Sequence, residues 1–156
     1  MTTKTTQSDI LMRWLIRRDM PIVLEIESRS FRHPWTEEHF LSEVRRANAI
    51  GMVATHDSMV VGYTIYAIHA SYIEVLNLAV HPDYRRMSVG QTMLNMLKRK
   101  LVFRRRGEIC LYISEANLAA QLFFKANGFQ AIEVCKGMYD TCDDDAYLMS
   151  YRIGDV

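Results

Sequence analysis

Apolar residues recur along the chain with two different periods, and the period predicts the type of each element. Apolar positions two apart predict strands, whereas apolar positions three or four apart predict helices. Strands are expected over residues 11–17, 50–56, 59–69, 72–80, 108–114, 129–136 and 146–153. Helices are expected over residues 19–30, 88–106 and 117–126, with a further one that follows Thr36 and carries Phe40, Leu41 and Val44.

Turn-forming and capping residues place the boundaries of several elements. Asp19 followed by Pro21 is typical of a helix start, with the aspartate as N-cap. Asp57 and Ser58 separate two strand-like segments and predict the turn of an antiparallel hairpin. Asn117 is expected to cap the helix that follows it. The local sequence therefore specifies where these elements begin or turn.

The order of the elements predicts a mixed α/β fold with one sheet and helices on both faces. The connection from the strand 72–80 through the helix 88–106 to the strand 108–114 has the length of a βαβ unit. Those two strands are therefore expected to be parallel, with a right-handed crossover. At 156 residues the chain is expected to form a single domain over 1–156, in which residues 1–10 are a flexible tail.

Composition and charge exclude several classes of protein. The chain is 49% hydrophobic and 24% charged, which is close to the average of globular proteins. Its formal net charge of +1 gives no overall field that would gather nucleic acid or an anionic membrane. The first residues are polar, and no run of about 18 apolar residues occurs. We therefore expect a cytoplasmic protein without direct nucleic-acid or membrane partners.

The cysteines and histidines lack the spacing of known ligand sets. Cys110, Cys135 and Cys142 are an odd number without a CxxC pair, so they are expected to be buried free thiols. The five histidines form no HExxH or similar pattern and are expected to be surface or packing residues. No metal is expected.

Two basic segments lie around the helix 88–106. Its last turns carry a cluster that is either a solvated helix end or a site that attracts a phosphorylated ligand or acidic partner. This cluster consists of Lys98, Arg99, Lys100, Arg104, Arg105 and Arg106. Before the helix, the stretch 76–90 reads as a strand, a short basic loop and a helix start. Unpaired amides and the dipole at a helix start, with Arg85 and Arg86 nearby, suit a pyrophosphate. From these residues alone the segment is either such an anion site or an ordinary surface loop.

The same stretch resembles a known family. Residues 85–90, Arg-Arg-Met-Ser-Val-Gly, are similar to the [QR]-x-x-G-x-[GA] loop of the GNAT acyl-CoA N-acetyltransferases. Further motifs at 31–36, 76–84, 117–129 and 139–146 resemble the branch that includes the bacterial ribosomal-protein alanine N-acetyltransferases. The resemblance covers residues 16–153.

The resemblance implies a mixed, mostly antiparallel seven-stranded sheet whose fourth and fifth strands separate at their C-terminal ends, with acetyl-CoA as co-substrate between them. The main chain of Leu78, Ala79 and Val80 would bind the pantetheine arm. The pyrophosphate would lie on the loop made of Arg85, Arg86, Met87, Ser88, Val89 and Gly90. Asn117 and Phe124 would line the other side of the cofactor.

Three positions depart from the family pattern. Ser88 replaces the central loop glycine, and we expect its hydroxyl to donate to a phosphate oxygen rather than the residue to need a left-handed conformation. Tyr112 stands where the alanine acetyltransferases carry a glutamate base, and Phe124 where they carry a tyrosine acid. Tyr112 either orders a water molecule or packs. Either a different pair of residues therefore transfers the protons, or the protein is not a fast enzyme.

The resemblance offers two replacements. Glu74 occupies the position of the general-base glutamate in the histone-acetyltransferase branch; the alternative is a solvated strand carboxylate. Tyr139 aligns with a tyrosine that covers the acceptor in N-terminal acetyltransferases, which implies acceptor binding or proton donation. The segments 31–36 and 137–145 are expected to frame the acceptor groove.

Proton affinity narrows the choice of acceptor. A lysine amine with a pKa near 10.4 costs about 4.6 kcal/mol to deprotonate at pH 7, whereas an α-amine near 7.8 costs only about 1 kcal/mol. A site with few residues for proton transfer therefore favours a protein N-terminal α-amine as acceptor. This amine would attack the thioester directly in a ternary complex. The alternatives are a small-amine or lysine acetyltransferase and a non-catalytic acyl-CoA-binding regulator. The sequence decides neither the acyl chain length nor between monomer and homodimer.

Overall fold

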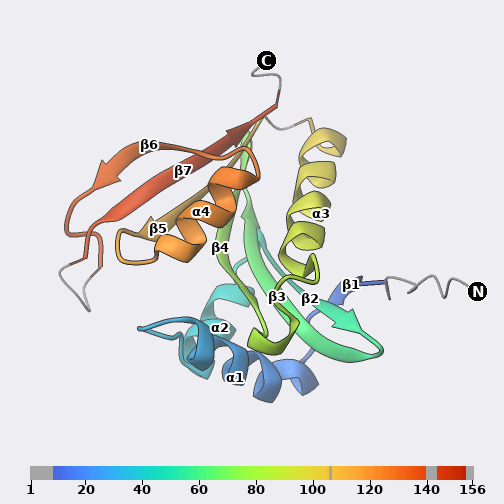
Figure 1. The fold of residues 1–156 in the computed structure, drawn as a ribbon. Helices are drawn as coiled ribbons and strands as arrows, with labels where there is room; N and C mark the ends of the chain where they lie inside the picture. The colour runs from blue at the N-terminus through green and yellow to red at the C-terminus, as the bar shows by residue number, and fades with distance from the viewer. Residues whose placement is uncertain (1–8, 106, 140–143, 154–156) are drawn as a thin grey trace, which may run out of the picture. The chain divides into compact units, whose positions relative to one another are not determined.

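The computed structural model describes residues 9–105, 107–139 and 144–153 (Figure 1). The strands are β1 (Leu11–Trp14), β2 (Ala49–His56), β3 (Met59–Ile68), β4 (Tyr72–Val80), β5 (Glu108–Ser114), β6 (Gln130–Cys135) and β7 (Ala146–Arg152). The helices are α1 (Met20–Ser30), α2 (Glu37–Val44), α3 (Val89–Phe103) and α4 (Leu118–Ala126), with short 3-10 turns η1 (Arg17–Asp19) and η2 (Pro82–Tyr84). These elements confirm the order predicted from the apolar pattern.

The strands form a seven-stranded sheet in the order β1-β2-β3-β4-β5-β7-β6. β1 is antiparallel to β2, and β7 is antiparallel to both β5 and β6. β4 and β5 are parallel, as expected, with register pairs that run from Tyr72–Glu108 to Glu74–Cys110. Although β4 continues to Val80 and β5 to Ser114, these register pairs involve only the first part of each strand. The mixed, mostly antiparallel sheet with parallel fourth and fifth strands is therefore confirmed.

The chain divides into two compact units, one formed by residues 1–65 and 77–94 and the other by residues 66–76 and 95–156. In the first unit, a Cβ at Gly62 would lie 3.2 Å from the Met93 side chain of α3. The next residue, Tyr63, instead reaches Glu27 of α1 with its hydroxyl. Because successive strand residues point to opposite faces, α1 and α3 cover opposite faces of this part of the sheet.

The second unit is held by aromatic side chains beneath α4, which Figure 1 shows next to β5 and β7. The rings of Phe124 and Phe129 meet edge to face with centroids 5.2 Å apart, and Phe129 continues to Tyr151 of β7 at 5.6 Å. Lys98 of α3 lies 4.5 Å from the centre of the Tyr151 ring and donates a 2.7 Å hydrogen bond to the Asn127 carbonyl. These contacts bury one face of β5 and β7.

Three boundaries differ from the prediction. The Asp19 carboxylate does not cap α1 and instead binds the Arg13 guanidinium at 2.7 and 2.8 Å. The chain leaves β1 at Trp14 and forms η1 instead of extending the strand to residue 17. α3 ends at Phe103, before the arginines 104–106, of which Arg106 lies outside the described residues. The ion pair explains the first difference, because the carboxylate holds β1 and so is drawn away from the helix amides.

Residues 1–8 of the expected N-terminal tail also lie outside the described part of the chain. Within the described part, no helix has the length and apolar character needed to cross a membrane.

Candidate active site

A short exposed loop joins the end of β4 to α3 and carries the predicted pyrophosphate site. Residues 85–88 are all exposed, and α3 begins directly afterwards at Val89. The Thr92 amide donates a 2.9 Å bond to the Ser88 carbonyl, as expected in the first turn of a helix. Exposed cations beside these amides and the helix dipole fit the diphosphate of acetyl-CoA.

The backbone of this loop is left-handed at two residues that are not glycine. Arg86 has a φ of 67° and Ser88 a φ of 63°. The expectation that Ser88 would avoid this conformation is wrong, because the loop keeps the backbone path that suits glycine. A non-glycine residue in this region costs about 1–2 kcal/mol. Donation from the Ser88 hydroxyl to a phosphate oxygen stays a prediction.

Arg85 lies back across the end of β4. Its guanidinium is 3.4 Å from the Val80 carbonyl and 3.4 Å from the Ser30 hydroxyl of α1. Both contacts are long for hydrogen bonds, so a stronger acceptor such as a phosphate oxygen could compete for the guanidinium. Met87, two residues on, is 39% exposed.

The end of β4 packs firmly in the first unit. Leu78 and Val80 are half-buried against a cluster of Ala54, Val61, Val89 and Met93. Just before them, the Asn77 carbonyl accepts a 2.9 Å bond from the Thr64 hydroxyl. The main chain of Leu78, Ala79 and Val80, predicted to bind the pantetheine arm, thus belongs to a strand end that packs against this cluster.

Asn117 and Phe124 belong to the second unit. Asn117 caps α4 as predicted, because its side-chain oxygen accepts the Ala120 amide at 3.1 Å. Phe124 is only 4% exposed, with its ring edge to face with Phe123 and Phe129. Its role visible in the structure is packing, and contact with the cofactor stays a prediction for both residues.

Glu74 is half-buried near the start of β4 and bonds to a histidine. The side chains of Glu74 and His69 are 22% and 25% exposed, and His69 Nε2 lies 3.0 Å from Glu74 Oε1. The tight turn between β3 and β4, closed by a 2.9 Å bond from the His69 amide to the Tyr72 carbonyl, brings them together. The His69 ring also stacks on Tyr72, with centroids 4.3 Å apart. Glu74 is thus an oriented carboxylate with part of its surface open to solvent.

Two further residues lie near Glu74 on β5. Cys110 is opposite Glu74 in the strand register, and burial, followed by the charges of Glu74 and Glu108, raises the pKa of its thiol to about 12. Burial also raises the pKa of Tyr112, and smaller contributions come from Cys135, Cys110, Glu74 and Glu133. Both groups therefore stay protonated at neutral pH, so neither is a ready base. Among the carboxylates that act on these two residues, Glu74 is the one that bonds to His69.

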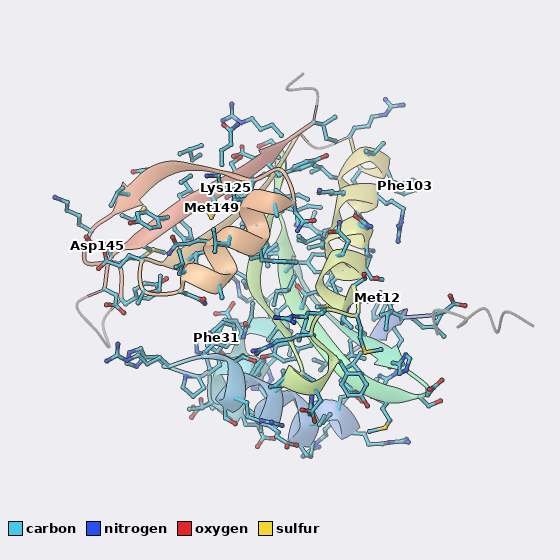
Figure 2. The ribbon with its side chains drawn as sticks, viewed as in Figure 1. Met12, Phe31, Phe103, Lys125, Asp145 and Met149 are labelled. Carbon is cyan, nitrogen blue, oxygen red and sulfur yellow. The ribbon has the colours of Figure 1, made fainter. Side chains whose placement is uncertain are left out.

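Tyr139 lies in the connection between β6 and β7 and is half-buried. The connection is closed by the carboxylate of Asp145, which Figure 2 labels next to β7 and which accepts the Gly137 amide at 3.1 Å. The Asp145 main chain in turn exchanges bonds of 2.8 and 3.1 Å with Glu115, at the end of β5. Residues 140–143 lie outside the described residues.

The thiols differ in part from the expectation. Cys110 and Cys135 are free but half-buried rather than fully buried, and Cys142 lies outside the described residues. Over the described ranges, no three histidine, cysteine or acidic side chains are arranged to hold a metal ion.

Two important side chains were not identified from the sequence. Glu27 is 1% exposed and accepts three hydrogen bonds, and its position four residues after Val23, on the apolar face of α1, was a usable signal. His69 was expected only to pack or face solvent. No periodicity predicts its bond to Glu74, because the bond depends on the geometry of the turn.

Comparison with known proteins agrees with this geometry. Residues 47–131, more than half of the chain, match the model of the acetyltransferase (GNAT) domain. The [ribosomal protein bS18]-alanine N-acetyltransferase of Escherichia coli strain K12 is 27% identical over 137 residues, which covers 86% of this chain and 92% of that protein.

Solved structures show the same fold. The crystal structure of the ribosomal-protein-S18-alanine N-acetyltransferase from Escherichia coli has a TM-score of 0.81 at 24% identity and covers 93% of this chain and 94% of that chain. Arabidopsis thaliana Naa50 in complex with the bisubstrate analogue CoA-Ac-MVNAL has a TM-score of 0.76 at 16% identity, with 90% and 97% covered. The domain match and the shared fold together show that the chain belongs to the GNAT family of acetyltransferases, which transfer an acetyl group from acetyl-CoA to an amine.

Proposed function

We propose that this protein acetylates the α-amino group of a protein N-terminus. The observation that carries the proposal is the similarity to the Escherichia coli alanine N-acetyltransferase, which extends over nearly the whole of both chains. The lower cost of deprotonating an α-amine than a lysine at neutral pH supports the same acceptor. A ribosomal protein as acceptor is consistent with a cytoplasmic location. We expect the chain to act as a single acetyltransferase domain.

The family resemblance assigns several residues to the binding of acetyl-CoA. Arg85, Arg86 and the amides of the first turn of α3 would hold the diphosphate, with Met87, Ser88, Val89 and Gly90 shaping that loop. The main chain of Leu78, Ala79 and Val80 would bind the pantetheine arm, and the family resemblance assigns Asn117 and Phe124 to the cofactor as well. The exposure of the loop and its two arginines supports this assignment.

The chemical step is a direct transfer. The neutral amine nitrogen attacks the thioester carbonyl carbon, a C–N bond forms, and the C–S bond breaks to release the CoA thiol. Glu74 would accept the proton that the amine loses, because its carboxylate is oriented by His69 and partly open. Tyr139 would contact the acceptor or donate a proton to the leaving thiolate.

The proposal is tested with three acceptors of matched concentration. The first is a peptide with a free N-terminal alanine and no lysine, the second is an N-acetylated peptide with one internal lysine, and the third is spermidine. Release of CoA thiol gives the rate, and mass spectrometry of the product locates the acetyl group. We expect α-acetylation of the first peptide at a rate at least tenfold above the other two acceptors.

Each other outcome points to a defined alternative. Preference for the lysine peptide or spermidine would replace the proposal with a lysine or small-amine acetyltransferase. Micromolar binding of acetyl-CoA by calorimetry without turnover on any acceptor would indicate a non-catalytic acyl-CoA-binding regulator.

A further inference from the structure

The buried carboxylate of Glu27 joins three segments of the first unit. Its Oε1 accepts the Trp35 amide at 2.9 Å, and its Oε2 accepts both the Tyr63 hydroxyl and the Asn77 side-chain amide, the latter at 2.8 Å. These donors come from the loop before α2, from β3 and from β4. The side chain is 1% exposed, so solvent offers no replacement for a lost partner.

Glu27 holds both ends of the loop between α1 and α2, at residues 31–36. Its main-chain carbonyl accepts the Phe31 amide at 3.1 Å, where α1 ends, and its side chain accepts the Trp35 amide. Figure 2 labels Phe31 at the beginning of this loop. One residue thus fixes the span of a loop whose intermediate residues 32–34 are exposed.

Aromatic contacts reinforce the far end of the loop. The Trp35 ring stacks on His39 at 4.1 Å and meets Phe40 edge to face at 5.0 Å, and Phe40 in turn contacts Tyr63 at 5.7 Å. Tyr63 therefore contacts this end of the loop both through Glu27 and through Phe40. The conformation of Trp35 depends on the same buried cluster as the carboxylate.

The donors on β4 and on the loop differ in how else they are held. Asn77 also bonds to Thr64 through its carbonyl and sits within a paired strand. The Trp35 amide belongs to no helix or strand, and its hydrogen bond to the Glu27 carboxylate fixes the main chain of the loop at this point. Loss of the carboxylate should therefore release the loop far more than the strand.

We propose that Glu27 is a positioning residue for the acceptor: it holds the 31–36 loop in register with the strand that carries Leu78, Ala79 and Val80. The inference rests on the proposed function, in which this loop frames the groove for the N-terminal peptide. A carboxylate is suited to the task because it accepts several hydrogen bonds at once without donating any. Its three neutral donors offset the loss of hydration.

The kinetic test uses Glu27→Gln, which preserves size and removes one acceptor group. We expect KM for the acceptor peptide to rise at least tenfold, with KM for acetyl-CoA changed less than twofold. The matched control is Asp19→Asn, a buried carboxylate of the same unit that binds Arg13 and the Ile16 amide and has no bond to this loop. If Glu27 were merely structural, Glu27→Gln would behave like Asp19→Asn: the amount of active enzyme would fall, and the KM values for the acceptor peptide and acetyl-CoA would stay unchanged. That result would overturn the proposal.

Two measurements remain decisive if Glu27→Gln folds poorly. Hydrogen exchange of the wild-type protein should show the Trp35 amide protected at least 100-fold more than those of Arg32 and His33, and equal exchange would overturn the proposal. In a Trp14→Phe background, Trp35 is the remaining tryptophan, and Glu27→Asp should raise its quenching by acrylamide while Asp19→Asn should not.

The two proposals fail in distinguishable ways. Absence of wild-type turnover on every amine would overturn the proposed function and the acceptor role together. Wild-type turnover with an unprotected Trp35 amide would overturn the positioning role alone.

Discussion

Glu27 and Glu74 have the same side chain, but their surroundings suit the two carboxylates to different tasks. Glu27 is almost fully buried and accepts three hydrogen bonds from neutral donors. Glu74 is about a fifth exposed and bonds to His69. A buried carboxylate that already accepts three hydrogen bonds is closed to a substrate, whereas a partly open one can take a proton from it. The contrast separates the carboxylate proposed to position the acceptor loop from the one proposed to accept a proton.

The largest expected effect comes from Glu74→Gln. We expect kcat to fall by at least about 100-fold, because a positioned general base typically contributes between about 10² and 10⁴. Acetyl-CoA affinity, measured by calorimetry, should stay within twofold, since Glu74 lies outside the loop at 85–90. Glu133→Gln, which neutralises an exposed carboxylate on β6, is the control. A kcat within threefold of the wild type would remove Glu74 from the mechanism and end the contrast.

A pair of buried tyrosines on β3 tests the other side of the comparison. The Tyr63 hydroxyl donates to Glu27, and burial followed by the Glu27 charge raises the pKa of that hydroxyl, so it remains a donor. Tyr63→Phe should therefore lower the free energy of unfolding by about 1.5–3 kcal/mol in urea denaturation. The Tyr66 hydroxyl has no hydrogen-bond partner among the described residues, so Tyr66→Phe should change it by less than about 0.5 kcal/mol. Equal losses of unfolding free energy in the two variants would mean that the hydrogen bond from Tyr63 to Glu27 adds no measurable stability.

The architecture was predictable because each element is specified locally. The turn at Asp57 and Ser58 is an example: both residues have positive φ values of 48° and 66°, as a two-residue hairpin turn requires, and both are residue types that favour turns. The short cap of α4 by Asn117 is another. In both cases the information lies within three or four residues of the chain.

The parts that could not be predicted depend on tertiary contacts. Asp19 does not cap α1 as predicted, because its carboxylate accepts two charge-assisted hydrogen bonds from Arg13, six residues earlier in the chain. The left-handed backbone of Ser88 is imposed by the loop that joins β4 to α3, against the preference of the residue itself. Glu27 meets Asn77 fifty positions later in the chain, which no local pattern encodes. The family resemblance supplied the candidate site, but these long-range bonds define its shape.

The orientation of Glu74 offers a smaller, more selective test. His69→Ala removes the bond to Glu74 and the stacking on Tyr72, so we expect kcat to fall about tenfold because the base is less well placed. The KM values for both substrates should stay within twofold, which a general loss of structure would not produce. His69→Gln keeps a donor and should recover part of kcat. Equal activity of the two variants would show that the bond does not orient Glu74.

The smallest expected effect is read at the Cys110 thiol, which reports the charge of Glu74. Its pKa of about 12 arises first from burial and then from the nearby charges of Glu74 and Glu108. At pH 8 only about one thiol in 10⁴ is ionised, so alkylation by iodoacetamide should be at least 100-fold slower than that of an exposed cysteine, and should rise about tenfold per pH unit up to pH 10. Glu74→Gln removes one negative charge, which favours the thiolate and should accelerate alkylation several-fold. His69→Ala keeps the Glu74 carboxylate, so its charge effect on the alkylation rate should be absent. Equal acceleration of alkylation in both variants would show that a looser turn, rather than the charge of Glu74, sets the reactivity of the Cys110 thiol.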